Sequence, residues 1–110
     1  AKIDFNQPAS SIENQILALN PEPMSYCLLN EQPLRILDAV SLGNTDWSAL
    51  DPENQTLTQP GTLSFDNKRV LVACGAGTLL QLKTVQPAGK NPMPALDWAR
   101  GTAGRSIRLE

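Results

Sequence analysis

The sequence predicts a mainly β fold, an OB-like Greek-key barrel of five or six strands with an N-terminal helix and a short C-terminal helix. Three observations predict it. The spacing of the apolar residues changes from helical to alternating after the first 24 residues. Short apolar segments then follow at close spacing, with Gly, Pro, Asn or Asp between them. Closing such a sheet into a barrel removes its exposed edges. A half-open sandwich is the alternative.

The length and composition fit a single domain. The chain has 110 residues, of which 41% are hydrophobic and 18% are charged, as in ordinary globular proteins. It lacks histidine, which excludes a His general base, a Ser-His-Asp triad and a His metal ligand in this chain. Its two cysteines do not make a four-ligand zinc site without carboxylates. We therefore expect no catalytic, cofactor-binding or metal-binding residues here.

The sequence predicts no targeting or membrane segment. Apolar runs such as Val70–Cys74 are far too short to cross a bilayer, and residues 1–4 lack an apolar signal core. The chain also begins without Met, so we expect an excerpt from a longer protein. We take residues 1–108 as one barrel domain. Leu109-Glu110 are candidates for residues left from cloning, so we give them no weight.

Residues 1–24 predict a leading strand and a helix. Pro8 suits the first helical position, because its missing N–H would have no partner there. The Asn-Pro-Glu-Pro segment at 20–23 ends the helix, since each Pro disfavours helical backbone in the residue before it. Between these signals, apolar residues share one helical face at i, i+4 and i+7, namely Ile12, Ile16 and Leu19.

Residues 25–85 predict the strands of the barrel. Alternating or apolar segments occur at 25–30, 34–42, 62–65, 69–74 and 78–85. Turn residues lie between several of them, at 30–33, 60–61 and 66–68. The long polar loop 43–59, which contains Trp47, has a length that is usually functional or mobile.

Residues 86–108 predict a terminal loop and a short helix. The Gln-Pro-Ala-Gly-Lys segment at 86–90 breaks the chain, and Pro94 begins a helical turn that ends before Gly101. We expect Trp98 to pack this helix against the barrel.

Two short features have simple structural interpretations. Gly75-Ala76-Gly77 precedes a strand rather than a helix, so it predicts a hairpin turn and not a phosphate-binding loop. Cys27 and Cys74 both fall in predicted strands, where buried free thiols are expected. A disulfide between them requires that their two strands pair in register.

The charges are unevenly distributed along the chain. Residues 1–66 carry two basic and nine acidic side chains, for a net charge of −7, whereas residues 67–110 carry seven basic and two acidic, for a net charge of +5. A basic half can face a polyanion even when the whole chain is acidic. The candidate nucleic-acid-binding residues are Lys68, Arg69, Lys83, Lys90 and Arg100. The alternative is that these cations are solubility charges paired with the acidic half.

The aromatic content indicates which kind of nucleic acid would bind. Aromatic residues make up only 5% of the chain, whereas domains that bind single strands stack bases on exposed aromatic rings. We therefore expect contacts to the phosphates and shape of a folded RNA.

The order of motifs resembles the C-terminal domain of methionyl-tRNA formyltransferase. The resemblance rests on Ile-Asp-Phe at 3–5, the Leu-Asn-Pro-Glu-Pro end of the helix at 19–23 and Pro-Gly-Thr at 60–62. It continues through Val72–Gly77 and Val85–Lys90, with Met93 a few residues later. Three positions differ from residues that are frequent in the family, namely Leu17, Glu22 and Asn91.

The resemblance implies a non-catalytic tRNA-binding barrel, joined to an N-terminal catalytic domain of the same chain. The parent enzyme would transfer a formyl group from 10-formyltetrahydrofolate to the methionyl amine of initiator tRNA, in the cytoplasm of a bacterium or in an organelle matrix. This domain would itself bind no cofactor. The alternative is a barrel that braces the catalytic domain or a dimer of a related formyltransferase acting on a small molecule, such as a sugar nucleotide.

Overall fold

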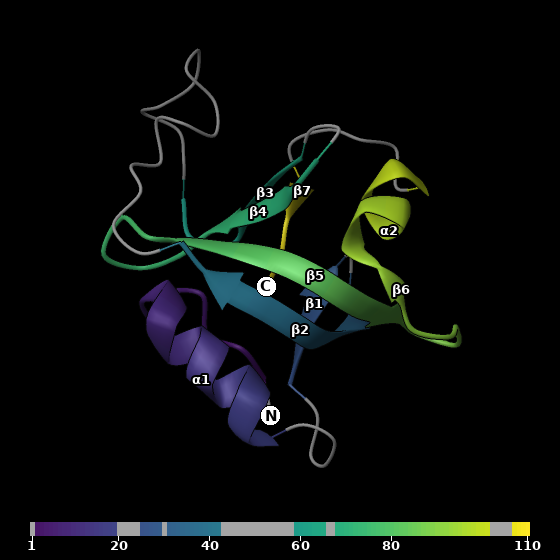
Figure 1. Ribbon diagram of the computed structural model, residues 1–110, viewed down its shortest axis with the longest axis horizontal. Helices are drawn as coiled ribbons and strands as arrows, with labels where there is room; N and C mark the ends of the chain where they lie inside the picture. Colours follow the sequence, from purple (N-terminus) through teal and green to yellow (C-terminus); the bar gives the residue numbers. More distant parts are fainter. Residues whose placement is uncertain (1, 20–24, 30, 43–58, 66–67, 102–106) are drawn as a thin grey trace.

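A curled antiparallel sheet with two helices forms the structure, a computed structural model that describes residues 2–19, 25–29, 31–42, 59–65, 68–101 and 107–110 (Figure 1). The helices are α1 (Ala9–Leu19) and α2 (Ala95–Gly101). The strands are β1 (Tyr26–Leu29), β2 (Gln32–Ser41), β3 (Thr62–Phe65), β4 (Val70–Ala73), β5 (Leu79–Pro87), β6 (Met93–Pro94) and β7 (Ile107–Arg108).

Within the described residues the strands form one sheet in the order β1-β2-β5-β4-β3-β7, with β6 paired to β5. All of these pairs are antiparallel. The β2–β5 pair is the longest, and its register shifts near Asp38, where the strands bend. The mainly β fold with a helix near each end, predicted from the sequence, is confirmed.

Residues 109 and 110 join the two edges of this sheet. The Leu109 N–H donates to the Gly61 carbonyl at 2.7 Å, next to β3. Glu110 and Leu28 of β1 then exchange two backbone hydrogen bonds, of 2.8 and 2.6 Å. Leu109 is also 1% exposed. Leu109-Glu110, to which we gave no weight in the sequence, therefore contribute to the fold, because their backbone closes the curled sheet.

The core lies inside the curled sheet and is continued by both helices. Alternation directs Leu34 and Ile36 of β2 and Leu80 and Leu82 of β5 inward, and after the register shift Val85 is buried as well. The predicted apolar face of α1 contributes Ile12 and Ile16, each 1% exposed. α2 contributes Trp98, as predicted, together with Ala95 and Ala99.

The helices occupy different sides of the sheet (Figure 1). α1 packs against β2 and β5, and the Ser41 N–H donates to Glu13 Oε2 at 3.1 Å. α2 packs against β4, β5 and β6. Each helix therefore covers part of the sheet. Exposed side chains remain on the outer face of β2 and β5, whereas all four residues of β4 are buried.

Several predicted boundaries shift. The β2 strand begins at Gln32, inside the predicted turn, and β5 continues to Pro87, through the start of the predicted break. Pairing with neighbouring strands extends both segments beyond the point where sequence signals would end them. The predicted loop 43–59 with Trp47 lies outside the described residues except for Gln59, and residues 66–67 of the predicted hairpin turn also lie outside them.

Candidate nucleic-acid interface and terminal pocket

All five cations predicted to bind nucleic acid are exposed at the surface. Lys68 and Arg69 precede β4, Lys83 lies on β5, Lys90 lies in the turn after β5, and Arg100 lies in the last turn of α2. They come from four separate local structures, so only the tertiary arrangement can bring them together.

The pairing of β4 with β5 brings Arg69 and Lys83 together. Val70 pairs with Leu82, and both side chains are buried in the core. In an antiparallel pair, the position before Val70 and the position after Leu82 then lie opposite one another on the outer face. Arg69 and Lys83 occupy these positions, and both are exposed.

A sixth cation, Arg35 on β2, shares this outer face. Its strand neighbours Leu34 and Ile36 are buried, so the Arg35 side chain points outward, and Arg35 pairs with Gln86 of β5. Sequence reasoning missed Arg35 because it counted the residue with the acidic half, although the alternation Leu-Arg-Ile carried the signal. We call Arg35, Arg69 and Lys83 the basic outer face.

One carboxylate lies within the basic outer face. Asp38 of β2 is exposed and pairs with Thr84, the residue that follows Lys83. A carboxylate at this position lowers the positive potential that a phosphate would meet.

Lys90 is presented by an ordered turn. The Lys90 N–H donates to the Pro87 carbonyl at 3.1 Å, and Gln86 Nε2 donates to the Lys90 carbonyl at 3.0 Å. Gly89 adopts a φ of 75°, which a residue with a side chain rarely adopts. The turn therefore fixes the Lys90 backbone and leaves its side chain exposed.

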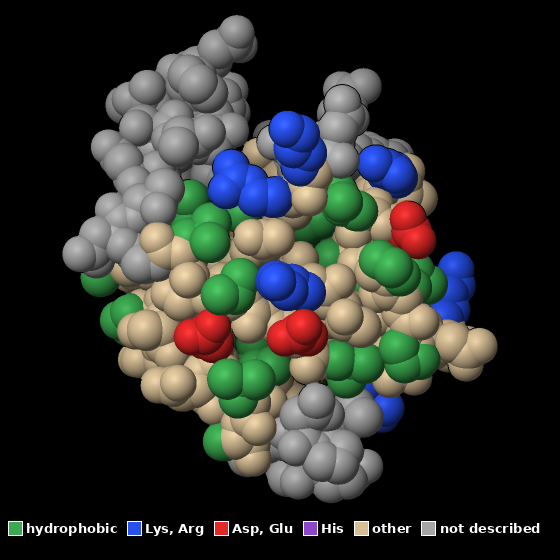
Figure 2. Space-filling model, in the orientation of Figure 1, with side chains coloured by type: hydrophobic (Ala, Val, Ile, Leu, Met, Phe, Trp, Pro, Cys, Tyr) green, Lys and Arg blue, Asp and Glu red, His purple; other side chains and the backbone are tan. Residues whose placement is uncertain are grey.

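Arg100 is held at the surface by the buried side of α2. Trp98 and Ala99 are buried in the core, whereas Asp97 and Arg100 are exposed. Figure 2 shows Lys and Arg side chains in a band across the upper part of one face, from the region over β3 and β4 to α2, with an acidic side chain beside α2.

The structure groups the predicted set only in part. Lys68, Arg69 and Lys83 lie together at the β4–β5 pair, whereas Lys90 lies beyond the end of β5 and Arg100 lies on α2. The candidate interface is therefore an extended surface and not a compact cluster. An extended surface suits a long polyanion better than a single phosphate group.

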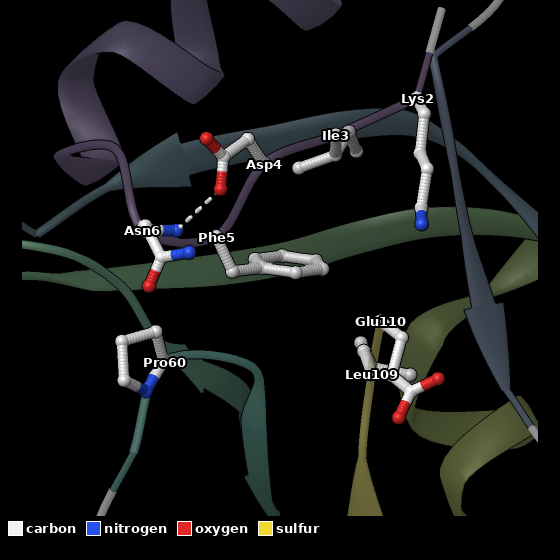
Figure 3. Close-up of a pocket in the computed structure, with 8 residues that line it drawn as sticks. All are labelled: Lys2, Ile3, Asp4, Phe5, Asn6, Pro60, Leu109 and Glu110. Carbon is white, nitrogen blue, oxygen red and sulfur yellow. Dashed lines mark hydrogen bonds between the residues drawn. The ribbon is translucent and has the colours of Figure 1, made fainter.

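A second feature is a pocket of about 290 Å³ beside the two ends of the described chain. Figure 3 shows the Phe5 ring and the Lys2 side chain pointing across it toward Leu109 and Glu110. Ile3, Asp4, Asn6 and Pro60 complete its walls. We call this the terminal pocket.

Comparison with known proteins identifies the family. The model of the formyl transferase C-terminal domain family matches residues 1–103. The chain belongs to this family. Its relatives include the methionyl-tRNA formyltransferase of Herpetosiphon aurantiacus, 44% identical over 90% of this chain and 29% of that protein. The proteins of the same name from Listeria welshimeri and Leifsonia xyli are 35% and 34% identical, over 96% and 97% of this chain.

The chain spans about 30% of the length of these relatives. A formyl transferase C-terminal domain of this size therefore corresponds to one part of each relative. The resemblance stated from the sequence motifs is confirmed at the level of the family.

Neither thiol of this formyl transferase C-terminal domain is suited to act as a nucleophile. Cys27 and Cys74 are free and buried, as predicted. Burial raises the pKa of each thiol from 9.0 to about 12, because the thiolate would lose its hydration. Lys2 acts in the opposite direction on Cys27, as does a backbone hydrogen bond from Leu80 on Cys74, but burial is the larger cause.

The described residues hold neither a metal-binding cluster nor a membrane-spanning helix. No group of three or more His, Cys, Asp or Glu side chains lies close enough within them to hold a metal ion. None of the helices in the same part of the chain is long and apolar enough to cross a membrane.

Proposed function

We propose that this chain is the tRNA-positioning domain of a methionyl-tRNA formyltransferase. The observation that supports it most strongly is the arrangement of exposed cations on adjacent strands of a barrel that belongs to the formyl transferase C-terminal domain family. The relatives at 34–44% identity carry the name methionyl-tRNA formyltransferase.

Electrostatic attraction explains how such a surface would act. Each phosphate that a Lys or Arg neutralises releases counterions, which favours binding without reading the base sequence. Arg35 on β2, Lys83 on β5 and Arg69 just before β4 would follow the phosphates of a folded tRNA, while Lys90 and Arg100 extend the contact beyond the sheet. Of the aromatic side chains that the structure describes, Phe5 and Trp98 are buried and Tyr26 is half-buried, so none of these three offers an open ring for base stacking.

The chemical step belongs to the part of the parent protein that precedes this domain. There the formyl group would pass from 10-formyltetrahydrofolate to the methionyl amine of initiator tRNA, in the cytoplasm of a bacterium or in an organelle matrix. Binding the tRNA at a second place restricts its position, so that the amine meets the formyl donor in a favourable orientation. The domain contributes binding and orientation.

The salt dependence of tRNA binding by the parent protein tests this proposal. Replacing Arg69 and Lys83 by Ala removes two cations that are adjacent on the basic outer face. The slope of log Kd for initiator tRNA against log salt is expected to fall by about two, because about one counterion is released for each phosphate contact.

Two charge variants make the test specific. Asp38→Asn removes the carboxylate within the basic outer face and is expected to tighten tRNA binding. Glu31→Gln makes the same charge change in the β1–β2 turn and is expected to leave binding unchanged. A salt slope that R69A and K83A do not change would contradict the proposal and favour a barrel that braces a small-molecule formyltransferase.

A further inference from the structure

The N-terminal arm, residues 2–8, follows a fixed path into the barrel. At its start the Ile3 N–H donates to the Tyr26 carbonyl at 2.8 Å, and Lys2 forms a bridge with the same residue. Ile3 and Phe5 are 2% and 5% exposed and belong to the core. The chain therefore enters the domain in one defined direction.

The turn between β4 and β5 fixes the other end of the arm. The Gly75 N–H donates to the Gln7 carbonyl at 2.9 Å, and Pro8 forms a bridge with Gly75. Thr78 Oγ1 accepts from the Ala9 N–H at 2.8 Å and donates to the Gly75 carbonyl at 2.7 Å. The hydroxyl of Thr78 thus provides a hydrogen-bond partner for the first N–H group of α1.

The terminal pocket opens beside this arm. Phe5, Ile3 and Leu109 give it an apolar inner wall, and each of these side chains is almost fully buried. Lys2, Asp4 and Glu110 are exposed at its edge. Its volume of about 290 Å³ is at the small end of the range for small-molecule sites, so it has room for one or two side chains of a docked segment.

We propose that the terminal pocket is the docking site for the part of the parent chain that precedes this domain. This inference rests on the proposed function. The chain matches about 30% of the length of its relatives, and the family model is that of a C-terminal domain. The preceding part then reaches the domain at Lys2, and Lys2 itself lines the pocket. The fixed arm brings that part to the same place in every molecule.

The chemistry of the pocket defines the segment that would fill it. The Phe5 ring and Leu109 are only 5% and 1% exposed, so the incoming segment would make most of its contacts with the exposed polar edge of the pocket. The edge holds two carboxylates and one ammonium group, so a neighbouring Lys or Arg on the incoming segment would balance its charge. A docked segment of this kind would set the orientation of the catalytic part relative to the basic outer face.

Thiol labelling of the full-length parent protein tests the proposal. Asn6 lines the pocket and is exposed, so Asn6→Cys places a thiol at the pocket without disturbing the core. Asn14→Cys is the matched control, because Asn14 is exposed on α1 and does not line the pocket. Cys27 and Cys74 are buried and contribute little background.

The expected result is that iodoacetamide labels Asn6→Cys at least tenfold more slowly than Asn14→Cys in the native parent, and at the same rate in urea. Equal rates in the native protein would overturn the proposal. A photo-cross-linker attached at Asn6→Cys is expected to capture a peptide from the preceding part of the same chain. Capture of a second copy would also overturn it. Neither result changes the salt slope that tests tRNA binding.

Discussion

Two regions of the barrel contrast in how tightly their geometry is specified. Around the arm, the β4–β5 turn and Leu109-Glu110, backbone atoms meet in hydrogen bonds of 2.6–2.9 Å between segments distant in sequence. On the basic outer face, Arg35 and Lys83 on the paired strands β2 and β5, and Arg69 just before β4, have exposed side chains.

The contrast indicates which property a substitution in each region would change. Substitutions around the arm and the closing residues alter the packing of backbone and core, so they change the free energy of unfolding. Substitutions on the basic outer face change the charge of exposed side chains and leave the buried core in place. Folding and binding should therefore respond to different sets of variants.

The largest effects are expected for Gly75→Ala and Leu109→Ala. A Cβ at Gly75 would collide with the Asn6 carbonyl, and backbone cannot move aside as a flexible side chain can. The free energy of unfolding should fall by about 3 kcal/mol, measured by urea denaturation.

Gly77→Ala is the matched control in the same turn. Gly77 has a φ of 69°, but no atom lies within 4 Å of the place that an alanine methyl would take, so only backbone strain opposes the substitution. Gly77→Ala should lower the free energy of unfolding by about 1 kcal/mol. Equal losses for the two variants would show that the contact with the arm does not matter.

Leu109→Ala tests the closure of the sheet. Removing this buried side chain leaves a cavity where the two sheet edges meet, and the expected loss is about 3 kcal/mol. Leu17→Ala, at a leucine that is 60% exposed, should change the free energy of unfolding by less than about 0.5 kcal/mol. A Leu109→Ala variant that is as stable as the unsubstituted protein would contradict a structural role for Leu109-Glu110.

High pH should weaken the fold through the two thiols. Their pKa is about 12 when folded and 9.0 when unfolded, so above pH 9 the unfolded state binds fewer protons and stability falls as the pH rises. The loss at pH 10 should be about 1.4 kcal/mol for each thiol. Urea denaturation at pH 7 and pH 10 measures it, and a Cys27→Ala, Cys74→Ala double variant should lose this component of the pH dependence.

The smallest effect on stability is expected on the exposed cations. Lys83→Ala and Lys90→Ala should each change the free energy of unfolding by less than about 0.5 kcal/mol, because both side chains are exposed. Thermal unfolding of the two variants checks this. A loss above about 1 kcal/mol would mean that these charges support the fold as well as binding.

Local sequence signals predicted most of the elements. The apolar face of α1, the alternation of β5 and the turn at 75–77 each depend on residues close together in the chain, and each lies where expected. The 62–65 strand was predicted with its bounds. Such signals act within a few residues, so a single sequence displays them directly.

Contacts between distant segments could not be predicted in this way. The Thr78 hydroxyl caps a helix that begins at Ala9, and nothing near either residue indicates the other. The closure by Leu109-Glu110 likewise depends on a match of two sheet edges. For the candidate interface, charge identified five cations. Only the strand register placed Arg69 opposite Lys83 and Arg35 on the same outer face, opposite Gln86.

The two backbone hydrogen bonds between Leu28 and Glu110 also determine when the sheet can close during synthesis. A ribosome makes Leu28 well before Glu110, so the nascent sheet keeps two open edges until Leu109 and Glu110 emerge from the exit tunnel. Any preceding part of the parent has left the tunnel by then and can fold first. After these two residues emerge, the hydrogen bonds of Leu109 to Gly61 and of Glu110 to Leu28 would form late and close the open sheet.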